Sequence, residues 1–177
     1  MPNYRRLRPP GATYFFTLAL QDRGSDLLIS HIHDLRAAYA ATIRDMPVRC
    51  EAIVVLPDHL HAVWTLPLGD SAYSERWRKI KARFSRAVDR AHRPLHLPAS
   101  KVSKRECGIW QRRFWEHVIR DDADYRRHVS VCWGNPVRHG LVPRPADWPH
   151  SSIHREIGKG LVPPDWTGGQ QDGRFGE

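Results

Sequence analysis

The fold is decided by the stretch Ile53-Val54-Val55-Leu56-Pro57-Asp58-His59-Leu60-His61-Ala62-Val63-Trp64. β-Branched residues on both sides of a Pro-Asp break predict two short strands joined at a turn, over residues 49–57 and 59–66. Because side chains alternate between the faces of a strand, His59 and His61 project from one face. The opposite face is apolar and comprises Leu60, Ala62, Trp64 and Leu66. Two imidazoles on one rigid strand can hold a divalent cation, although such pairs are more often packing or surface residues.

The rest of the chain predicts two more strands and three helices. Residues 13–20 and 110–119 are rich in aromatic and β-branched residues and predict strands. Helices are expected over 31–45, 71–91 and from Asp121 to about Gly134, before Asn135-Pro136. The second helix should bury the stripe Trp77, Ile80, Phe84 and Val88.

This element order, strand-helix-strand-strand-helix-strand, predicts an α+β fold of the ferredoxin-like β-α-β-β-α-β type. The expected sandwich has an antiparallel sheet with helices on one face, plus an added C-terminal helix. We expect a single domain over residues 1–158. A tail over 159–177, with little apolar content, should be mobile.

Composition favours a polyanionic partner. Lys and Arg number 28 against 19 Asp and Glu, which gives a net charge of +9. An excess of this size is typical of nucleic-acid binding, although a basic protein without such a partner is a reasonable alternative. Three widely spaced cysteines (Cys50, Cys107 and Cys132), no leader-like N-terminus and no apolar run of membrane-spanning length predict a cytoplasmic protein with reduced thiols. With DNA as the polyanionic partner, it would be associated with the nucleoid.

Three basic segments are candidates for DNA contacts. They are an N-terminal arm, one side of the helix over 71–91, and the loop before residue 110. On that helix the basic positions also include Arg76 and Arg90, although basic residues on a helix are often simply solvated. The candidate DNA-binding residues are Tyr4, Arg5, Arg6, Lys79, Arg83, Arg86, Lys101, Lys104 and Arg105.

Three further motifs point to a family. They are Trp110-Gln111-Arg112-Arg113-Phe114-Trp115-Glu116-His117, Asn135-Pro136-Val137-Arg138-His139-Gly140-Leu141-Val142 and Asp147-Trp148-Pro149-His150-Ser151-Ser152-Ile153-His154-Arg155. Together with Leu56-Pro57-Asp58-His59-Leu60-His61, they resemble the REP-associated tyrosine transposases, which are single-tyrosine members of the HUH endonuclease superfamily. The resemblance runs in order from about Tyr4 to Trp166.

The resemblance implies a nuclease and strand transferase that acts on single-stranded DNA hairpins of the REP palindrome type with Mg²⁺ or Mn²⁺. In that family a tyrosine attacks a phosphodiester and forms a 5′-phosphotyrosine link with release of a 3′-hydroxyl. His59, His61 and Asn135 would bind the cation, which would polarise the scissile phosphate. The oligomeric state stays open, with a preference for the monomer.

The chain departs from the family at the nucleophile. The family's tyrosine falls four residues before Asn135, where this sequence has Val131, which has no nucleophilic atom. Tyr125 is the nearest tyrosine in sequence, but it lies about 240° around the helix from position 131 and is expected to pack with apolar residues. Cys132 and Ser130 should also point away. Tyr125 is therefore only a weak substitute.

Three functions are compatible with these patterns. The first is a transposase-like protein that cleaves and rejoins hairpin DNA, and the second is a hairpin-binding protein that keeps the metal site but does not cleave. The third is a basic RNA-binding module on the same scaffold, which would need neither His59 nor His61. The order-preserving resemblance favours the first two, and a phosphotyrosine adduct would separate them.

Overall fold

The computed structural model describes residues 9–88, 108–168 and 175–176. A four-stranded sheet forms its centre, built from β1 (Thr13–Ala19), β2 (Arg49–Val55), β3 (His59–Thr65) and β4 (Trp115–Val118). The strand order is β2-β3-β1-β4 and every neighbouring pair is antiparallel. This is the sheet of a ferredoxin-like fold, as the sequence predicts.

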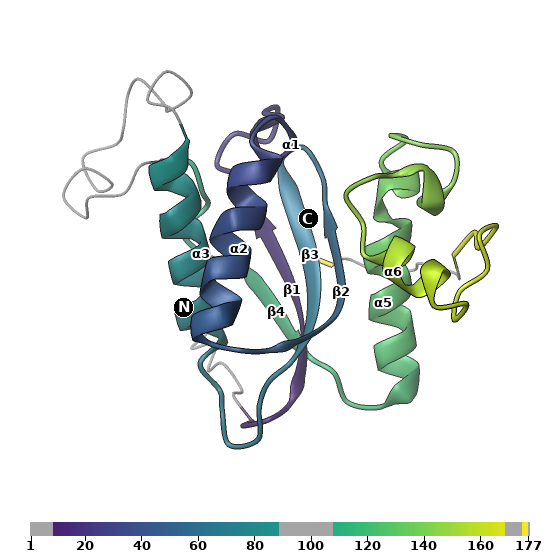
Figure 1. The fold of residues 1–177 in the computed structure, drawn as a ribbon, viewed down its shortest axis with the longest axis horizontal. Coiled ribbons are helices and arrows are strands. Elements are labelled where there is room, and N and C mark those ends of the chain that lie inside the picture. Colours follow the sequence, from purple (N-terminus) through teal and green to yellow (C-terminus); the bar gives the residue numbers. More distant parts are fainter. Residues whose placement is uncertain (1–8, 89–107, 169–174, 177) are drawn as a thin grey trace, which may run out of the picture.

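Helices cover both faces of the sheet (Figure 1). On one face lie α1 (Leu27–Ser30), α2 (Ile32–Asp45) and α3 (Tyr73–Ala87). On the other lie α5 (Asp122–Arg138), the 3₁₀ turn η2 (Pro145–Asp147) and α6 (Ile153–Gly158). The added C-terminal helix therefore packs opposite the two helices that belong to the basic fold.

Each face of the sheet has its own core. Beneath α2 and α3, Leu60, Ala62 and Trp64 are buried, and the rings of Trp64 and Trp77 stack 3.9 Å apart. Beneath α5 a second core contains Phe15, Val54, Val63, Val131 and Ile153. The alternation predicted for 59–66 is thus confirmed, and it places His59 and His61 on the α5 side.

Helix α5 begins where expected but ends later. Asp121 is its N-cap, and its carboxylate accepts a hydrogen bond from the Asp124 amide at 2.8 Å. The prediction that it ends before Asn135-Pro136 is wrong, since the helix continues through Pro136 to Arg138. Residues 131–136 are all buried. We attribute the continuation to this packing, because each buried large apolar side chain contributes about 1.5–3 kcal/mol against about 3 kcal/mol for an internal proline.

The strand predicted over 110–119 is shorter than expected. Only Trp115–Val118 pairs with β1 as a strand, while Trp110 forms an isolated bridge with Leu20. The polar run Gln111-Arg112-Arg113 lies between these two contacts and has little β propensity.

The motif over residues 147–155 closes the β2 edge of the sheet. Val55 donates its amide to the His150 carbonyl at 2.9 Å, and Ser152 donates to the Ile53 carbonyl at 2.8 Å. The indole of Trp148 donates to the Val55 carbonyl at 2.8 Å. Backbone groups that would otherwise invite pairing with another chain are satisfied within the molecule.

Parts of the segment after Gly158 pack against the domain. The Trp166 ring lies edge-on to Trp133 with centroids 5.7 Å apart, and Phe175 is buried. The division into a domain over 1–158 and a mobile tail over 159–177 stays a prediction. Within the described residues, no helix combines the length and the apolar character that a bilayer crossing requires.

Candidate metal site and nucleic-acid interface

The candidate metal site lies between β3 and α5. His59 and His61 are both almost completely buried, and their ring centroids are 5.1 Å apart. Asn135, on α5, is also buried, and its Oδ1 lies 3.2 Å from His59 Nε2. The three residues proposed for the cation from sequence therefore belong to one buried cluster.

Each histidine is held by its Nδ1 atom. His59 Nδ1 lies 2.7 Å from an Asp58 carboxylate oxygen, and His61 Nδ1 lies 2.9 Å from the Thr17 hydroxyl. A carboxylate on one ring nitrogen fixes the proton there and leaves the electron pair on the other, which is how metal-binding histidines are usually oriented. His59 Nε2 then faces the Asn135 amide oxygen, and both atoms are electron-pair donors.

The protonation state of His59 suits a ligand. Burial lowers its pKa below the ordinary value, against the opposing effect of the hydrogen bond to Asp58. The ring is therefore neutral near pH 7, as coordination requires. Two imidazoles and an amide oxygen form a donor set that fits a divalent transition ion such as Mn²⁺, one of the two cations that the family resemblance implies.

His139 adds a third imidazole at the exposed end of this cluster. It caps α5, and its ring centroid is 5.0 Å from that of His59. His139 is exposed, whereas His59 is buried, so the cluster reaches the surface at the C-terminal end of α5.

Position 131 is filled by an apolar side chain. Val131 is fully buried in the core beneath α5 and lies one helical turn before Asn135. The helix crosses β3 at this point, since the thiol of Cys132 lies 3.6 Å from the His61 carbonyl oxygen. The position at which the family resemblance places the nucleophile thus lies next to the candidate metal-binding residues. Val131 has no nucleophilic atom at this position.

Tyr125 lies at the far end of the sheet. Burial raises its pKa above the ordinary value, and the charge of Glu51 raises it further. Glu51 comes three residues before Val54, the partner of His61 in the sheet, which corresponds to about 10 Å along a strand. Tyr125 is thus a partly buried residue of α5 that lies near the start of β2 and packs against the core, as its helix position predicts.

The four basic residues of α3 singled out from sequence divide into three groups. Arg76 is buried and does not belong to a solvent-facing stripe: its guanidinium binds Asp70 at 2.6 Å and the Met46 and Pro47 carbonyls. Lys79 and Arg83 face α2. Arg86 is exposed.

Polar contacts hold Arg83 against α2 and Lys79 against Met46, the residue that caps the end of α2. Arg83 donates to Thr42 at 2.7 Å and to Asp45 at 2.6 Å, while Lys79 Nζ lies 3.4 Å from the Met46 sulfur. The arm Tyr4, Arg5 and Arg6, the residue Arg90, and the loop residues Lys101, Lys104 and Arg105 lie outside the described residues.

A basic groove on the outer side of α3 was not anticipated from sequence. It has a volume of about 670 Å³ and runs between α3 and residues 108–114. Four cationic and three aromatic side chains line it: Arg78, Lys81, Arg86, Arg112, Trp77, Trp110 and Phe114. Lys81 lies over the Trp110 ring at 5.7 Å and donates to the Gln111 carbonyl at 2.6 Å. The groove joins two segments more than twenty residues apart, so helix periodicity alone could not reveal it.

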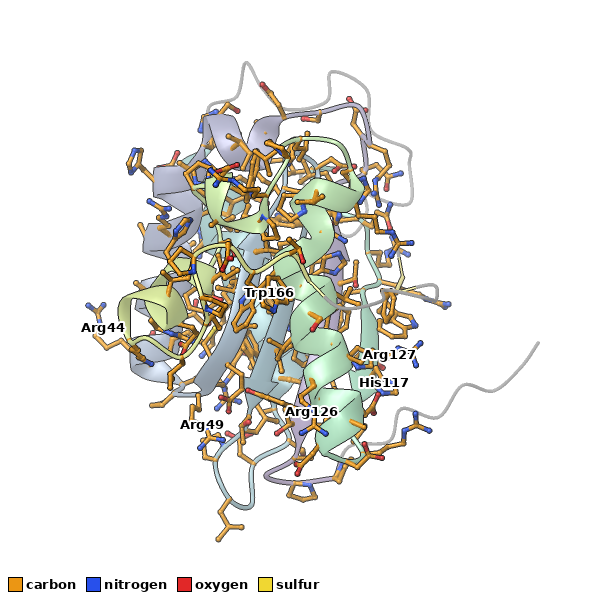
Figure 2. All side chains as sticks on the ribbon, turned by 90° about the vertical axis from the view of Figure 1, so that its right-hand side faces the viewer. Arg44, Arg49, His117, Arg126, Arg127 and Trp166 are labelled. Carbon is orange, nitrogen blue, oxygen red and sulfur yellow. The ribbon has the colours of Figure 1, made fainter. Side chains whose placement is uncertain are left out.

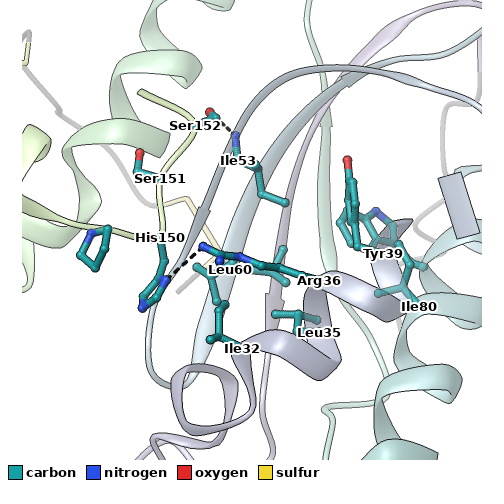
Figure 3. Close-up of a pocket in the computed structure, with 13 residues that line it drawn as sticks. Ile32, Leu35, Arg36, Tyr39, Ile53, Leu60, Ile80, His150, Ser151 and Ser152 are labelled. Carbon is teal, nitrogen blue, oxygen red and sulfur yellow. Dashed lines mark hydrogen bonds between the residues drawn. The ribbon is translucent and has the colours of Figure 1, made fainter. Parts of the chain in front are cut away.

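A second hollow lies between α2 and the segment that covers β2 (Figure 3). Its volume is about 250 Å³ and its walls are mainly apolar, including Ile32, Leu35, Ile53 and Leu60. Arg36 and His150 approach each other at 3.4 Å at this hollow. Its lining offers few charges for a nucleic acid.

Comparison with known proteins decides the family. The chain is 44% identical over 180 residues to the REP-associated tyrosine transposase of Escherichia coli strain K12, covering all of this chain and 98% of that protein. This chain belongs to the REP-associated tyrosine transposase family. A putative REP-associated tyrosine transposase of Haemophilus influenzae is likewise 44% identical, over 168 residues that cover 95% of this chain and 94% of the relative. No protein-family model matches the chain.

The fold agrees with that of a solved family member. The structure of a REP-associated tyrosine transposase bound to a REP hairpin superposes with a TM-score of 0.83 at 41% identity, covering 99% of this chain and 96% of that one. The α+β fold of this family member is therefore shown by the likeness in both sequence and structure.

Proposed function

We propose that this protein binds single-stranded or hairpin DNA of the REP type and keeps the family's cation site, but does not form a phosphotyrosine link. The observation that carries the proposal is the buried Val131 beside an otherwise complete cluster of His59, His61 and Asn135. The likeness to a relative solved with a REP hairpin supports hairpin DNA as the ligand.

The cation site would serve the DNA backbone. A divalent ion such as Mg²⁺ or Mn²⁺, held by His59, His61 and Asn135, would polarise phosphoryl oxygens and neutralise charge there. Asp58 and Thr17 orient the two rings, and burial keeps His59 neutral. Because Val131 has no proton to lose and no nucleophilic atom, the chain's own residues can position a phosphodiester without a covalent step.

The groove beside α3 is the second part of the proposed interface. Cationic side chains at its walls suit phosphates, and the partly exposed Phe114 supplies an apolar face of the kind on which unpaired bases stack. Arg86 belongs both to this groove and to the residues proposed from sequence. Lys79 and Arg83 stay candidates, although both are held against α2.

A cleavage assay on labelled REP-type hairpin DNA with Mn²⁺ or Mg²⁺ tests the proposal. The unaltered chain should bind the hairpin, measured by fluorescence anisotropy, without strand cleavage or covalent adduct on a denaturing gel. Val131→Tyr should form an adduct, and His59→Ala/His61→Ala in that background should abolish it. If Val131→Tyr is too crowded to fold, the unaltered chain alone still decides, because an adduct formed by it contradicts the proposal.

Tyr125→Phe is the matched control. If the unaltered chain cleaves and Tyr125→Phe does not, Tyr125 is the nucleophile and the protein is a full transposase. If a chelator does not weaken hairpin binding by the unaltered chain, the cation does not contribute to binding.

A further inference from the structure

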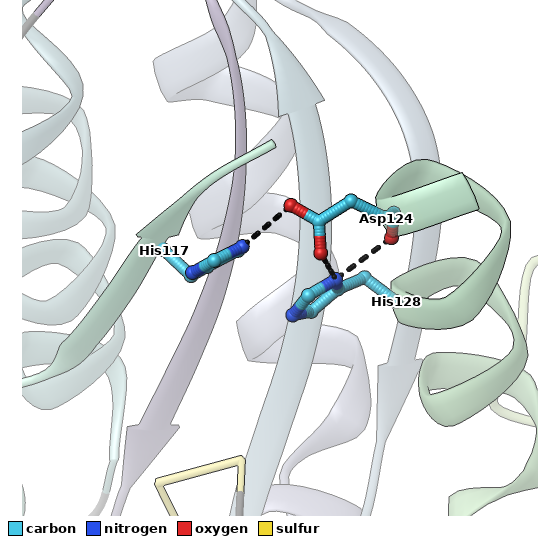
Figure 4. A group of neighbouring side chains, drawn as sticks. All are labelled: His117, Asp124 and His128. Atoms are coloured by element: carbon cyan, nitrogen blue, oxygen red, sulfur yellow. Dashed lines mark hydrogen bonds and ion pairs between the residues drawn. The ribbon is translucent and has the colours of Figure 1, made fainter. Parts of the chain in front are cut away.

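A second cluster of metal-binding side chains lies at the other end of α5 (Figure 4). It joins His117 from β4 with Asp124 and His128 from the first turns of α5. One ligand atom from each residue can be chosen so that all three lie within 4.8 Å of one another. Phe15 separates this cluster from the first one, since its ring centroid is 5.2 Å from His61 and 4.9 Å from His128.

The two imidazoles converge on one carboxylate. His117 Nε2 lies 2.7 Å from Asp124 Oδ2, and His128 Nδ1 lies 3.1 Å from Asp124 Oδ1. Figure 4 shows each ring directing a nitrogen toward the Asp124 carboxylate from a different element. Ligand atoms lie about 2–2.2 Å from a divalent ion and therefore about 3 Å from one another. Small ring rotations would bring the ligand atoms of His117, Asp124 and His128 to this spacing.

The carboxylate at the centre is fixed and ionised. Although burial by itself would raise the pKa of Asp124, its hydrogen bonds to His117 and to the Arg120 amide lower it to about 2. The Arg120 amide donates to Oδ2 at 3.1 Å. The position of the ligand is therefore set before any cation binds.

The cluster is closed on one side and accessible on the other. Asp124 and His128 are buried, whereas the His117 side chain is 25% exposed. His117 and the neighbouring Arg126 and Arg127 are seen at this end of α5 in Figure 2. The Arg120 guanidinium, 3.3 Å from Asp124, opposes a cation, but this side chain is 72% exposed and can move into solvent.

We infer that His117, Asp124 and His128 form a second divalent-metal site, distinct from the one at His59 and His61. Two imidazoles and one carboxylate, with positions left for water, suit a first-row transition ion such as Zn²⁺ and not Mg²⁺. To coordinate through these atoms, each ring must carry its proton on the other nitrogen, and His128 gives up its bond to the Asp124 carbonyl at 2.8 Å. A bound ion would join β4 to the first turns of α5.

The inference is tested with Zn²⁺ alone, by titration calorimetry on the His59→Ala/His61→Ala variant. That variant should bind one equivalent, and adding His117→Gln should weaken binding at least tenfold. Glutamine retains a donor for Asp124, so a purely structural hydrogen bond would survive this change. His33→Gln, at an exposed position of α2, is the matched control and should leave affinity unchanged.

Two calorimetric outcomes overturn the second site: no Zn²⁺ binding by His59→Ala/His61→Ala, or binding that His117→Gln leaves unchanged. A second measurement, which needs no substitution of the cluster residues, follows the imidazole NMR shifts of His117 and His128 during the same titration. They should move together at one equivalent, and unmoved shifts also overturn the site. Because these variants lack the first pair of histidines, failure here is independent of the proposed function.

Discussion

At the scale of single residues, the candidate site depends on which ring nitrogen each histidine presents. Asp58 and Thr17 take the Nδ1 atoms of His59 and His61, so the orientation of both rings is fixed by neighbours that are not themselves ligands. Asp58 is adjacent in sequence, but Thr17 lies 44 residues away on β1. A DNA-cleaving enzyme and a protein that only binds DNA would need the same orientation of these two rings to hold a cation. Under the proposed function, the valine at position 131 therefore removes the covalent step but leaves the residues proposed to bind the cation in place.

Asp58→Ala should weaken Mn²⁺ binding about 10–100-fold, which is the usual effect of losing a residue that orients a metal-binding histidine. Calorimetry in a His117→Gln background confines the measurement to the site at His59. Arg23→Ala is the control, because Arg23 binds the other oxygen of Asp58 at 2.6 Å without touching His59. Equal affinities for Asp58→Ala and Arg23→Ala would contradict the role assigned to Asp58.

At the scale of elements, the charged side chains of α3 do more than face solvent. Arg76 is 2% exposed, and it ties the start of α3 to the α2–β2 connection through Asp70 and two carbonyl oxygens. Periodicity correctly gives the apolar stripe of this helix. It cannot distinguish a solvated arginine from one buried at the edge of that stripe, because only the opposing segment decides between them.

Asp70→Asn should lower the free energy of unfolding by about 1–3 kcal/mol at pH 7, since it leaves the buried guanidinium without its counter-charge. The Arg76 hydrogen bond holds the pKa of Asp70 below its ordinary value of 3.8. A lowered folded pKa means that this stabilisation is complete above about pH 4 and is lost as the pH falls through the lowered value. Urea unfolding at pH 7 and pH 3 measures both effects.

Glu75→Gln is the comparison for Asp70→Asn. It removes the exposed ion pair with Arg78 on the same helix and should leave stability unchanged. The difference in free energy of unfolding between Asp70→Asn and the unaltered chain should be smaller at pH 3 than at pH 7. If it is equally large at pH 3, the Asp70–Arg76 charge pair is not its cause.

At the scale of the whole molecule, the sequence predicts the helices and strands that local residue patterns determine. It does not reveal sites that are formed by segments far apart in the chain. The strand order follows from the element order, and the pairing of His59 with His61 follows from strand alternation. The continuation of α5 through Pro136 could not be predicted, because it depends on burial of residues 131–136 against the sheet. For the same reason the groove and the His117–Asp124–His128 cluster emerge only once β4, α3 and α5 are placed.

The net charge of +9 predicts salt-dependent DNA binding, and the fold suggests where that charge acts. Arg86 and Arg83 lie three residues apart on α3, but Arg86 is exposed at the groove while Arg83 is paired with Asp45 at 2.6 Å. Arg86→Gln should reduce the slope of log affinity against log salt by about 0.7–0.9, the value of one phosphate contact. Arg83→Gln should change it less, since its charge is already neutralised within the molecule. Anisotropy titrations of hairpin DNA at several salt concentrations measure both slopes. A larger change in slope for Arg83→Gln than for Arg86→Gln would indicate that DNA binds at the α2–α3 surface and not in the groove.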